Sequence, residues 1–210
     1  MGDARNDPNL FLVDPDMRGI IPLGDFHVPK RLLRKVKQDP FRVTIDQAFT
    51  RVMELCAESA KGRESTWINS PILNLYSSLH REGHAHSIEC WQDGELAGGL
   101  YGVSFERVFC GESMFSRTAD ASKVALAWLV AAMRQAGFAL LDCQFMTDHL
   151  RTMGAIEIRQ RDYLQLLGAA VGSLSLGAGS DVKSTASRSS AGWKTSTPSS
   201  PTSSKPNRTG

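Results

Sequence analysis

The chain has 210 residues, a formal net charge of +2 and 41% hydrophobic residues, which is enough apolar material for one packed core. No run approaches the roughly 20 apolar residues that span a bilayer, and the N-terminus lacks a basic start followed by an apolar stretch. We therefore expect no membrane span and no secretory signal, with the cell interior as the location.

Residues 9–23 open the chain by mixing short apolar runs with turn residues, which predicts a loop and one strand. Pro29 suits the first position of a helix over 30–37. An alternating strand at 41–45 is followed by a helix from about 48 to 56, with Thr44 or Asp46 as its cap. Pro71 then lies in the first turn of a helix that starts near residue 70 and stops at Gly83.

The second half begins with a β-hairpin, because alternating segments at 85–91 and 96–103 flank an Asp-Gly turn. A strand at 107–112 precedes an apolar helix that opens at Asp120 and stops at Gly137. A buried strand at 140–145, a short helix at 149–153 and a strand at 154–158 complete the pattern. This order of elements predicts an α+β or mixed α/β domain.

The strand at 140–145 carries Asp142 and Gln144, whose side chains leave the same face of a regular strand. Two polar groups on a strand that is otherwise buried need partners or a wet cleft, so the pair is either a structural one or part of a site. Glu112 follows Gly111 at the end of its strand and is either part of that cleft or a solvated or capping residue. In the second case Lys123 is its expected ion-pair partner.

Two further groups of residues invite a functional reading. His84 and His86, with Glu89 nearby, suggest a zinc site, although no third ligand follows at a typical spacing. The four cysteines show no CxxC pair and are expected to be reduced, buried thiols. A cluster of basic residues with little acidic counterweight is either a solvated face or a phosphate-backbone contact: Lys30, Arg31, Arg34, Lys35, Lys37 and Arg42.

Seven motifs in order then carry a close resemblance to a known family. They are Thr66-Trp67-Ile68, the stretch 79–89 with Gly83-His84-Ala85-His86, Gly98-Gly99-Leu100-Tyr101-Gly102-Val103, the stretch 109–116 with Gly111-Glu112-Ser113-Met114-Phe115-Ser116, Asp120-Ala121-Ser122-Lys123, Asp142-Cys143-Gln144, and Leu150 with Gly154-Ala155. From about Phe11 to Leu167 the sequence resembles a leucyl/phenylalanyl-tRNA–protein transferase.

The resemblance implies a GNAT-like acyltransferase fold over residues 41–171, after a shortened N-terminal segment at 1–40 that carries the basic helix. The enzyme would move leucine, phenylalanine or methionine from an aminoacyl-tRNA to an N-terminal Arg or Lys of a protein and so mark that protein for degradation by the N-end rule. A cytoplasmic location, no metal and no cofactor go with it. The remaining residues, 172–210, are rich in Ser, Thr, Gly and Pro and are expected to be a disordered low-complexity tail.

The same resemblance implies roles for individual residues. Gln144 would hold the attacking amine, Asp142 would polarise the network or relay the proton, and Glu112 would suit a cationic N-terminus or order the cleft. Trp67 would support the terminal adenosine. The expected substrate-binding set also contains Leu100, Phe109, Met114, Ser116 and Thr147, and the expected tRNA-binding set contains Lys30, Arg31, Arg34, Lys35 and Arg42.

The sequence also departs from the family pattern. A Gly-rich N-terminal motif is missing, Leu12 or Val13 stands where a tryptophan is typical, and Thr147 stands where an asparagine is frequent. These departures predict weaker tRNA binding than in longer relatives, which a matching Michaelis constant for Phe-tRNA would contradict. They leave open a catalytically weakened GNAT-like module that binds tRNA or peptide, and a small metalloenzyme that uses His84 and His86.

Overall fold

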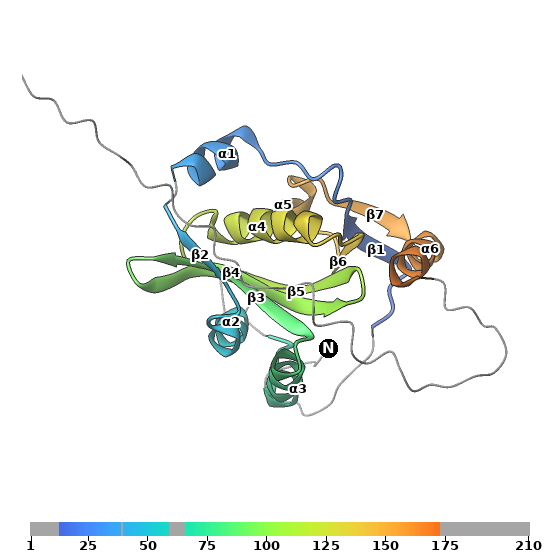
Figure 1. Cartoon of the computed structure of the whole chain (residues 1–210), viewed down its shortest axis with the longest axis horizontal. Coiled ribbons are helices and arrows are strands. Elements are labelled where there is room, and N and C mark those ends of the chain that lie inside the picture. The colour runs from blue at the N-terminus through green and yellow to red at the C-terminus, as the bar shows by residue number, and fades with distance from the viewer. Residues whose placement is uncertain (1–12, 39, 59–65, 173–210) are drawn as a thin grey trace, which may run out of the picture.

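A computed structural model describes residues 13–38, 40–58 and 66–172 of the chain, and these form one seven-stranded sheet with helices on both faces (Figure 1). Across the sheet the order is β2-β3-β4-β5-β6-β1-β7. The strands are β1 (Met17–Ile21), β2 (Arg42–Ile45), β3 (Ala85–Gln92), β4 (Glu95–Phe105), β5 (Val108–Ser116), β6 (Leu140–Gln144) and β7 (Ile156–Arg159). This confirms the mixed α/β class expected from the order of elements.

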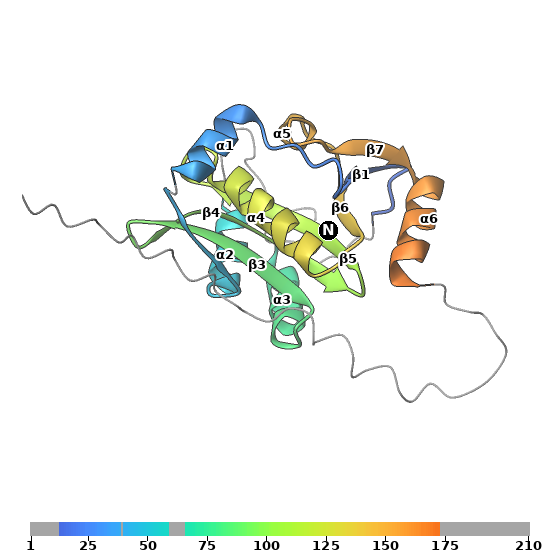
Figure 2. The same cartoon turned by 45° about the horizontal axis from the view of Figure 1, so that its top comes forward.

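The helices divide between the two faces of this sheet. They are α1 (Lys30–Lys37), α2 (Phe49–Cys56), α3 (Ser70–Arg81), α4 (Ala121–Gln135), α5 (Asp148–Arg151) and α6 (Gln160–Val171). Figures 1 and 2 show α4 and α1 over one face, α2 and α3 under the other, and α6 beside β1 and β7. Each group buries its own cluster of apolar side chains against the strands.

The longest helix, α4, organises the largest of these clusters. Its side chains Val124, Leu129 and Met133 are buried against the sheet, as the apolar pattern of the sequence predicts. The helix also connects β5 to β6, which run parallel, whereas every other neighbouring pair is antiparallel. A parallel pair needs such a crossover, so α4 fixes the one place in the sheet where two strands point the same way.

Two element ends differ from the expectation. The helix α2 has no side-chain cap from Thr44 or Asp46; instead the Ala48 N–H donates to the buried carboxylate of Glu89, 3.3 Å away. Strand β5 continues past Glu112 to Ser116. The helix α3, by contrast, begins as predicted, with Pro71 in its first turn and the Asn69 side chain accepting from the Ile72 N–H at 3.0 Å.

The helix α6 was not predicted from the sequence. Its buried residues are only Tyr163 and Ala170, and exposed Leu164 and Leu166 blur its apolar stripe. The strand β1 lies between β6 and β7, so the segment before residue 40 contributes to the same sheet as the rest. The boundary at residue 40 remains a prediction, and the predicted tail at 172–210 lies outside the described residues except for Gly172. None of the helices in the described ranges combines the length and apolar character that crossing a membrane requires.

Candidate active site

A pocket lies where the two parallel strands separate. Strands β5 and β6 pair only over Val108–Cys110 and Leu140–Asp142, and beyond those residues they diverge. The cavity has a volume of about 220 Å³. Its lining comes mainly from β4, β5, β6 and α4: Trp67, Leu100, Tyr101, Gly111, Glu112, Ser113, Met114, Leu126, Leu129, Leu141, Cys143, Gln144, Phe145, Thr147 and Leu150.

A β-bulge marks each strand at this point. On β5, Gly111 pairs with Gly102 and Ser113 pairs with Tyr101, which leaves Glu112 as the extra residue. On β6, Asp142 pairs with Ile20 and Gln144 pairs with Gly19, which leaves Cys143 as the extra residue. Bulges re-aim the neighbouring side chains, and here both occur at the edge of the pocket.

Glu112 contributes a carboxylate to an otherwise apolar wall. Burial raises the pKa of Glu112 above its usual range, while hydrogen bonds from the Gln144 side chain and the Tyr76 hydroxyl pull that pKa back down. Burial, followed by the Glu112 charge, raises the pKa of Tyr76, which therefore stays protonated and able to donate. The result is a desolvated acid that is held by two donors.

Gln144 ends β6 in an unusual backbone conformation. Its φ is +60°, in the left-handed region that residues other than glycine rarely adopt. The Gln144 N–H donates to Asp142 Oδ1 at 2.8 Å, which closes an Asx turn and offsets the strain of this conformation. The chain thus turns at the edge of the pocket, and the Gln144 side chain is directed to Glu112.

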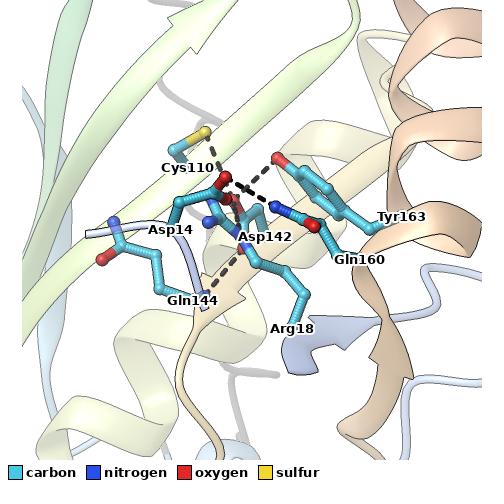
Figure 3. Close-up of polar contacts among 7 residues, drawn as sticks. All are labelled: Asp14, Arg18, Cys110, Asp142, Gln144, Gln160 and Tyr163. Carbon is cyan, nitrogen blue, oxygen red and sulfur yellow. Dashed lines mark hydrogen bonds and ion pairs between the residues drawn. The ribbon is translucent and has the colours of Figure 1, made fainter. Parts of the chain in front are cut away.

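Asp142 lies behind the pocket and is fully buried. Its carboxylate accepts hydrogen bonds from Arg18, from the Tyr163 hydroxyl at 2.9 Å and from the Gln144 N–H (Figure 3). The Cys110 thiol lies 3.9 Å from Oδ2, and burial raises the pKa of this thiol to about 12. Every polar group that surrounds the carboxylate is therefore a protonated donor.

The expectation that Asp142 and Gln144 share one face is wrong. The pocket is lined by Gln144 and not by Asp142. In Figure 3 the Gln144 side chain extends away from the Asp142 carboxylate, although its backbone N–H donates to it. The physical reason is the bulge at Cys143 together with the left-handed Gln144, which break the two-residue alternation of a regular strand.

The other expected substrate residues divide into two groups. Trp67, Leu100, Met114 and Thr147 all line the pocket. Phe109 is fully buried in the core and Ser116 lies at the exposed end of β5, where its hydroxyl donates to the Thr118 carbonyl at 2.8 Å; neither lines the pocket. Thr147 also caps α5 by accepting from the Leu150 N–H at 3.2 Å.

The expected basic residues lie on α1 and β2, away from the pocket lining. Lys30, Arg31 and Arg34 are exposed on α1. Lys35 instead lies over the Phe41 ring and donates to the Ala119 carbonyl. Arg42 lies 5.2 Å from the centre of the Trp91 ring. The solvent-facing part of the basic cluster therefore comprises the exposed side chains of α1 and Arg42 on β2.

The histidine motif has structural partners. His86 Nδ1 lies 2.7 Å from Asp46 Oδ2, and Glu89 accepts from the hydroxyls of Thr44 and Ser87, each at 2.5 Å. Among the described residues, no group of three or more His, Cys, Asp or Glu side chains could hold a metal ion. Lys123 does not pair with Glu112; its Nζ lies 3.4 Å from Asp120.

Arg18, Tyr76 and Tyr163 were missed by sequence reasoning, although they hold the carboxylates of the site. They come from β1, α3 and α6, far from Asp142 and Glu112 in the chain. A tyrosine or arginine in an amphipathic segment carries no local signal of a partner in another element, which lies 21 residues away for Tyr163 and 124 for Arg18. A carboxylate in the middle of an apolar strand, as at Asp142, did indicate that some buried donor was needed.

Comparison with known proteins gives a consistent result over most of the chain. A family profile described as "Leucyl/phenylalanyl-tRNA protein transferase" matches residues 20–168. Proteins named leucyl/phenylalanyl-tRNA–protein transferase are 58% identical over 171 residues in Hyphomonas neptunium, 56% over 170 in Novosphingobium aromaticivorans and 57% over 171 in Phenylobacterium zucineum. Each match covers 81% of this chain and 66%, 65% and 77% of the relative. The chain thus spans just under two thirds of the length of the first two.

Two solved structures show a distant likeness to this chain. The structure of L-PGS from Bacillus licheniformis matches with a TM-score of 0.42 and 11% identity, over 65% of this chain and 50% of that one. The C-terminal domain of a putative lysylphosphatidylglycerol synthetase from Agrobacterium fabrum matches with a TM-score of 0.40 and 10% identity, over 62% and 49%. These scores are too low to support an argument about the site.

Proposed function

The chain belongs to the leucyl/phenylalanyl-tRNA–protein transferase family, and on that premise we propose that it transfers leucine, phenylalanine or methionine from an aminoacyl-tRNA to the N-terminal Arg or Lys of an acceptor protein. The observation that carries the proposal is the meeting of Gln144 and Glu112 at the edge of an apolar cavity. An apolar side chain would enter the cavity while the reacting groups meet at its edge.

The apolar part of the pocket supports an apolar side chain as the transferred group. Leu100, Met114, Leu129 and Leu141 contribute only hydrocarbon or thioether surface. Each buried methylene contributes about 0.8 kcal/mol to binding. A pocket of this kind separates side chains that differ by one methylene by only about 10- to 200-fold, which agrees with acceptance of more than one apolar amino acid.

The proposed reaction is the aminolysis of an ester. The free α-amino group of the acceptor forms a bond to the acyl carbon, the bond from that carbon to the ribose oxygen breaks, and the proton lost by the amine ends on the ribose oxygen. The α-amino group has a pKa of about 7.7–8.0, so a useful fraction is neutral near physiological pH. Positioning of the two reactants therefore contributes more than a strong base.

Gln144 and Glu112 provide that positioning in the proposed mechanism. The hydrogen bond from the Gln144 side chain to Glu112 uses the amide N–H, because a carboxylate only accepts. The amide oxygen of Gln144 is then available to accept from the attacking amine. The negative charge of Glu112 lies close enough to this point to favour a cationic N-terminal Arg or Lys. We assign Asp142 a positioning role rather than a relay of protons, because it does not line the pocket.

The tRNA would contact the protein at two places. Trp67 lines the pocket and is suited to stack on the terminal adenosine, a contact worth about 1–3 kcal/mol. The exposed Lys30, Arg31 and Arg34 of α1 are suited to contact phosphates, which gives affinity without sequence specificity. Lys35 and Arg42 belong to the same proposed surface through their position, although both also pack on aromatic rings.

Three finer points complete the proposal. The separation of parallel β5 and β6 after an α4 crossover supports a GNAT-like acyltransferase fold. A cytoplasmic location follows from the proposed donor, since aminoacyl-tRNA is made there. The modified acceptor would carry a new N-terminal Leu, Phe or Met that marks it for degradation by the N-end rule.

A transfer assay tests this function. The purified chain is mixed with radiolabelled Leu-tRNA and one of three peptides that start with Arg, with Lys or with Nα-acetyl-Arg. We expect label in the Arg and Lys peptides and none in the acetylated peptide, which has no free amine. Binding of Leu-tRNA without transfer to any peptide would contradict the proposal and identify the chain as a binding module.

A further inference from the structure

An ionic cluster lies directly behind the pocket, outside its lining. Arg18 Nη2 lies 2.8 Å from Asp142 Oδ2, and Arg18 Nε lies 3.3 Å from both carboxylate oxygens. The Tyr163 hydroxyl donates to the same Oδ2 at 2.9 Å, and the Arg18 guanidinium lies 4.7 Å from the centre of the Tyr163 ring. Arg18 and Tyr163 thus contact each other, and both donate to the fully buried carboxylate of Asp142 (Figure 3).

The two donors come from opposite ends of the described chain. Arg18 is on β1, which pairs with β6 on one side and β7 on the other, and Tyr163 is on α6. A second link joins the start of α6 to the segment just before β1: Gln160 Nε2 donates to Asp14 Oδ2 at 2.6 Å, and the Gln160 N–H donates to the Asp16 carbonyl at 2.9 Å. The position of α6 is therefore tied to that of β1 at several points.

This cluster acts on the pocket through one hydrogen bond. Arg18 and Tyr163 hold the Asp142 carboxylate so that Oδ1 can accept from the Gln144 N–H at 2.8 Å. That bond holds Gln144 at a φ of +60°, which few non-glycine residues adopt without support. The direction of the Gln144 side chain toward Glu112 depends on this backbone conformation.

We propose that Arg18 and Tyr163 are positioning residues, which hold the Gln144 amide in its reactive orientation by fixing Asp142. This inference rests on the proposed function, because it concerns how the amine-binding amide is held. It gives α6 a part in the reaction, although no residue of α6 lines the pocket.

A cluster that only stabilises the fold and a cluster that positions Gln144 predict different results. A buried ion pair is weak grounds for stability, since its desolvation offsets most of the attraction. A positioning cluster predicts that small changes lower the turnover number without a matching loss of substrate binding. A purely structural cluster predicts that activity falls only when the protein begins to unfold.

The main test variant is Tyr163→Phe, which keeps the ring over Arg18 and removes only the hydroxyl. We expect kcat for Leu transfer to an Arg-starting peptide to fall about tenfold, with the KM for Leu-tRNA within twofold of the wild type. Arg18→Gln should lower kcat further. Arg18→Lys should recover part of the loss, because lysine keeps the charge but cannot supply the guanidinium fork.

The matched control is Ala170→Gly, which lies on the same helix and in the same core cluster but does not touch Asp142. It weakens α6, because glycine is a poorer helix former than alanine. We expect kcat to stay near the wild-type value at a temperature well below the melting transition. The proposal is overturned if Tyr163→Phe keeps full kcat, or loses only as much as Ala170→Gly does at an equal drop in Tm.

A second readout does not need activity. Hydrogen exchange of the Gln144 amide, followed by NMR, should be at least tenfold faster in Tyr163→Phe than in the wild type and unchanged in Ala170→Gly. If the wild type transfers nothing, the proposed function fails, yet this exchange still decides whether Tyr163 holds Gln144. Equal exchange in Tyr163→Phe and wild type would overturn the inference even if the enzyme is active.

Discussion

Replacement of Glu112 by Gln separates the charge of this residue from its shape. Glutamine has nearly the same volume and can still accept from Tyr76 and from Gln144. Hydrogen bonds to a charged acceptor contribute about 1.5–3 kcal/mol and those between neutral groups about 0.5–1.5 kcal/mol, so two bonds weaken by about 2 kcal/mol together. If this loss falls on the transition state, kcat at pH 8 should drop about 30-fold.

The pH dependence should change in a characteristic way. Transfer requires a neutral amine, with a pKa of about 7.7–8.0, and an ionised Glu112, whose pKa burial raises above its usual value of about 4.3. In the wild type the logarithm of kcat/KM should rise with slope 1 between these two pKa values and with slope 2 below that of Glu112. Glu112→Gln should show slope 1 throughout.

Glu112→Gln should raise the stability of the folded protein at neutral pH, although it lowers the activity. Because the folded pKa of Glu112 is raised, the folded protein retains a proton that the unfolded chain has lost, and stability falls as the pH rises from the unfolded pKa through the folded one. Glu112→Gln removes this loss, so its Tm should exceed that of the wild type at pH 7 and the gap should close toward pH 4.

The assay combines single-turnover transfer of labelled leucine from pH 4.5 to 8.5 with thermal unfolding at the same pH values. Equal slopes for the wild type and Glu112→Gln would refute an ionised Glu112 in the reaction. A variant that is less stable than the wild type at pH 7 would refute the desolvated carboxylate described here.

Three further predictions concern tRNA binding and the sheet. Trp67→Ala should raise the KM for Leu-tRNA about 5- to 150-fold through loss of stacking, whereas Trp128→Ala, an exposed tryptophan on α4 outside the pocket, should leave it unchanged. Joint replacement of Lys30, Arg31 and Arg34 by Gln should reduce the slope of log Kd against log salt by about 2 to 3 units. Replacement of the exposed Arg51 and Arg117, as a control, should leave this slope unchanged. An unchanged slope in the triple variant would exclude α1 as a phosphate contact. Gly102→Ala should lower the free energy of unfolding by about 1–3 kcal/mol or more, because the new Cβ would collide with the Cys110 carbonyl and the Phe109 ring. Gly168→Ala on α6 has open space around the new Cβ and should raise the free energy of unfolding. Urea denaturation measures both changes.

Sequence patterns located most of the elements because their periodicities are local. The apolar helix after Asp120 and the hairpin around Asp93-Gly94 follow from residues that lie within one helix or one turn of each other. The helix α6 was missed because its burial depends on β1 and β6, whose position the local pattern does not reveal. The class of the fold could therefore be predicted, while the insertion of β1 between β6 and β7 could not.

The site shows the same division. Trp67, Leu100, Met114, Glu112 and Gln144 were singled out by their motifs, and all line the pocket. The error over the shared face came from a regular two-residue alternation, which a bulge interrupts. Bulges leave little trace in one sequence, since any residue can occupy the extra position in the strand.

The donors to Asp142 belong to a third class of feature. Arg18 and Tyr163 are separated from it by 124 and 21 residues, and only the sheet order brings them together. Burial of a carboxylate predicts that donors exist but not where they lie in the chain. Such partners become visible only in three dimensions.

The central claim is that the Gln144 amide, held at the edge of the pocket, positions the attacking amine. The most direct measurement is single-turnover transfer of leucine from Leu-tRNA to an Arg-starting peptide by Gln144→Ala, compared with Gln165→Ala, an exposed glutamine on α6. We predict that Gln144→Ala slows transfer by about 100-fold or more while Leu-tRNA still binds, and that Gln165→Ala matches the wild type. Transfer by Gln144→Ala within twofold of the wild-type rate would contradict the account.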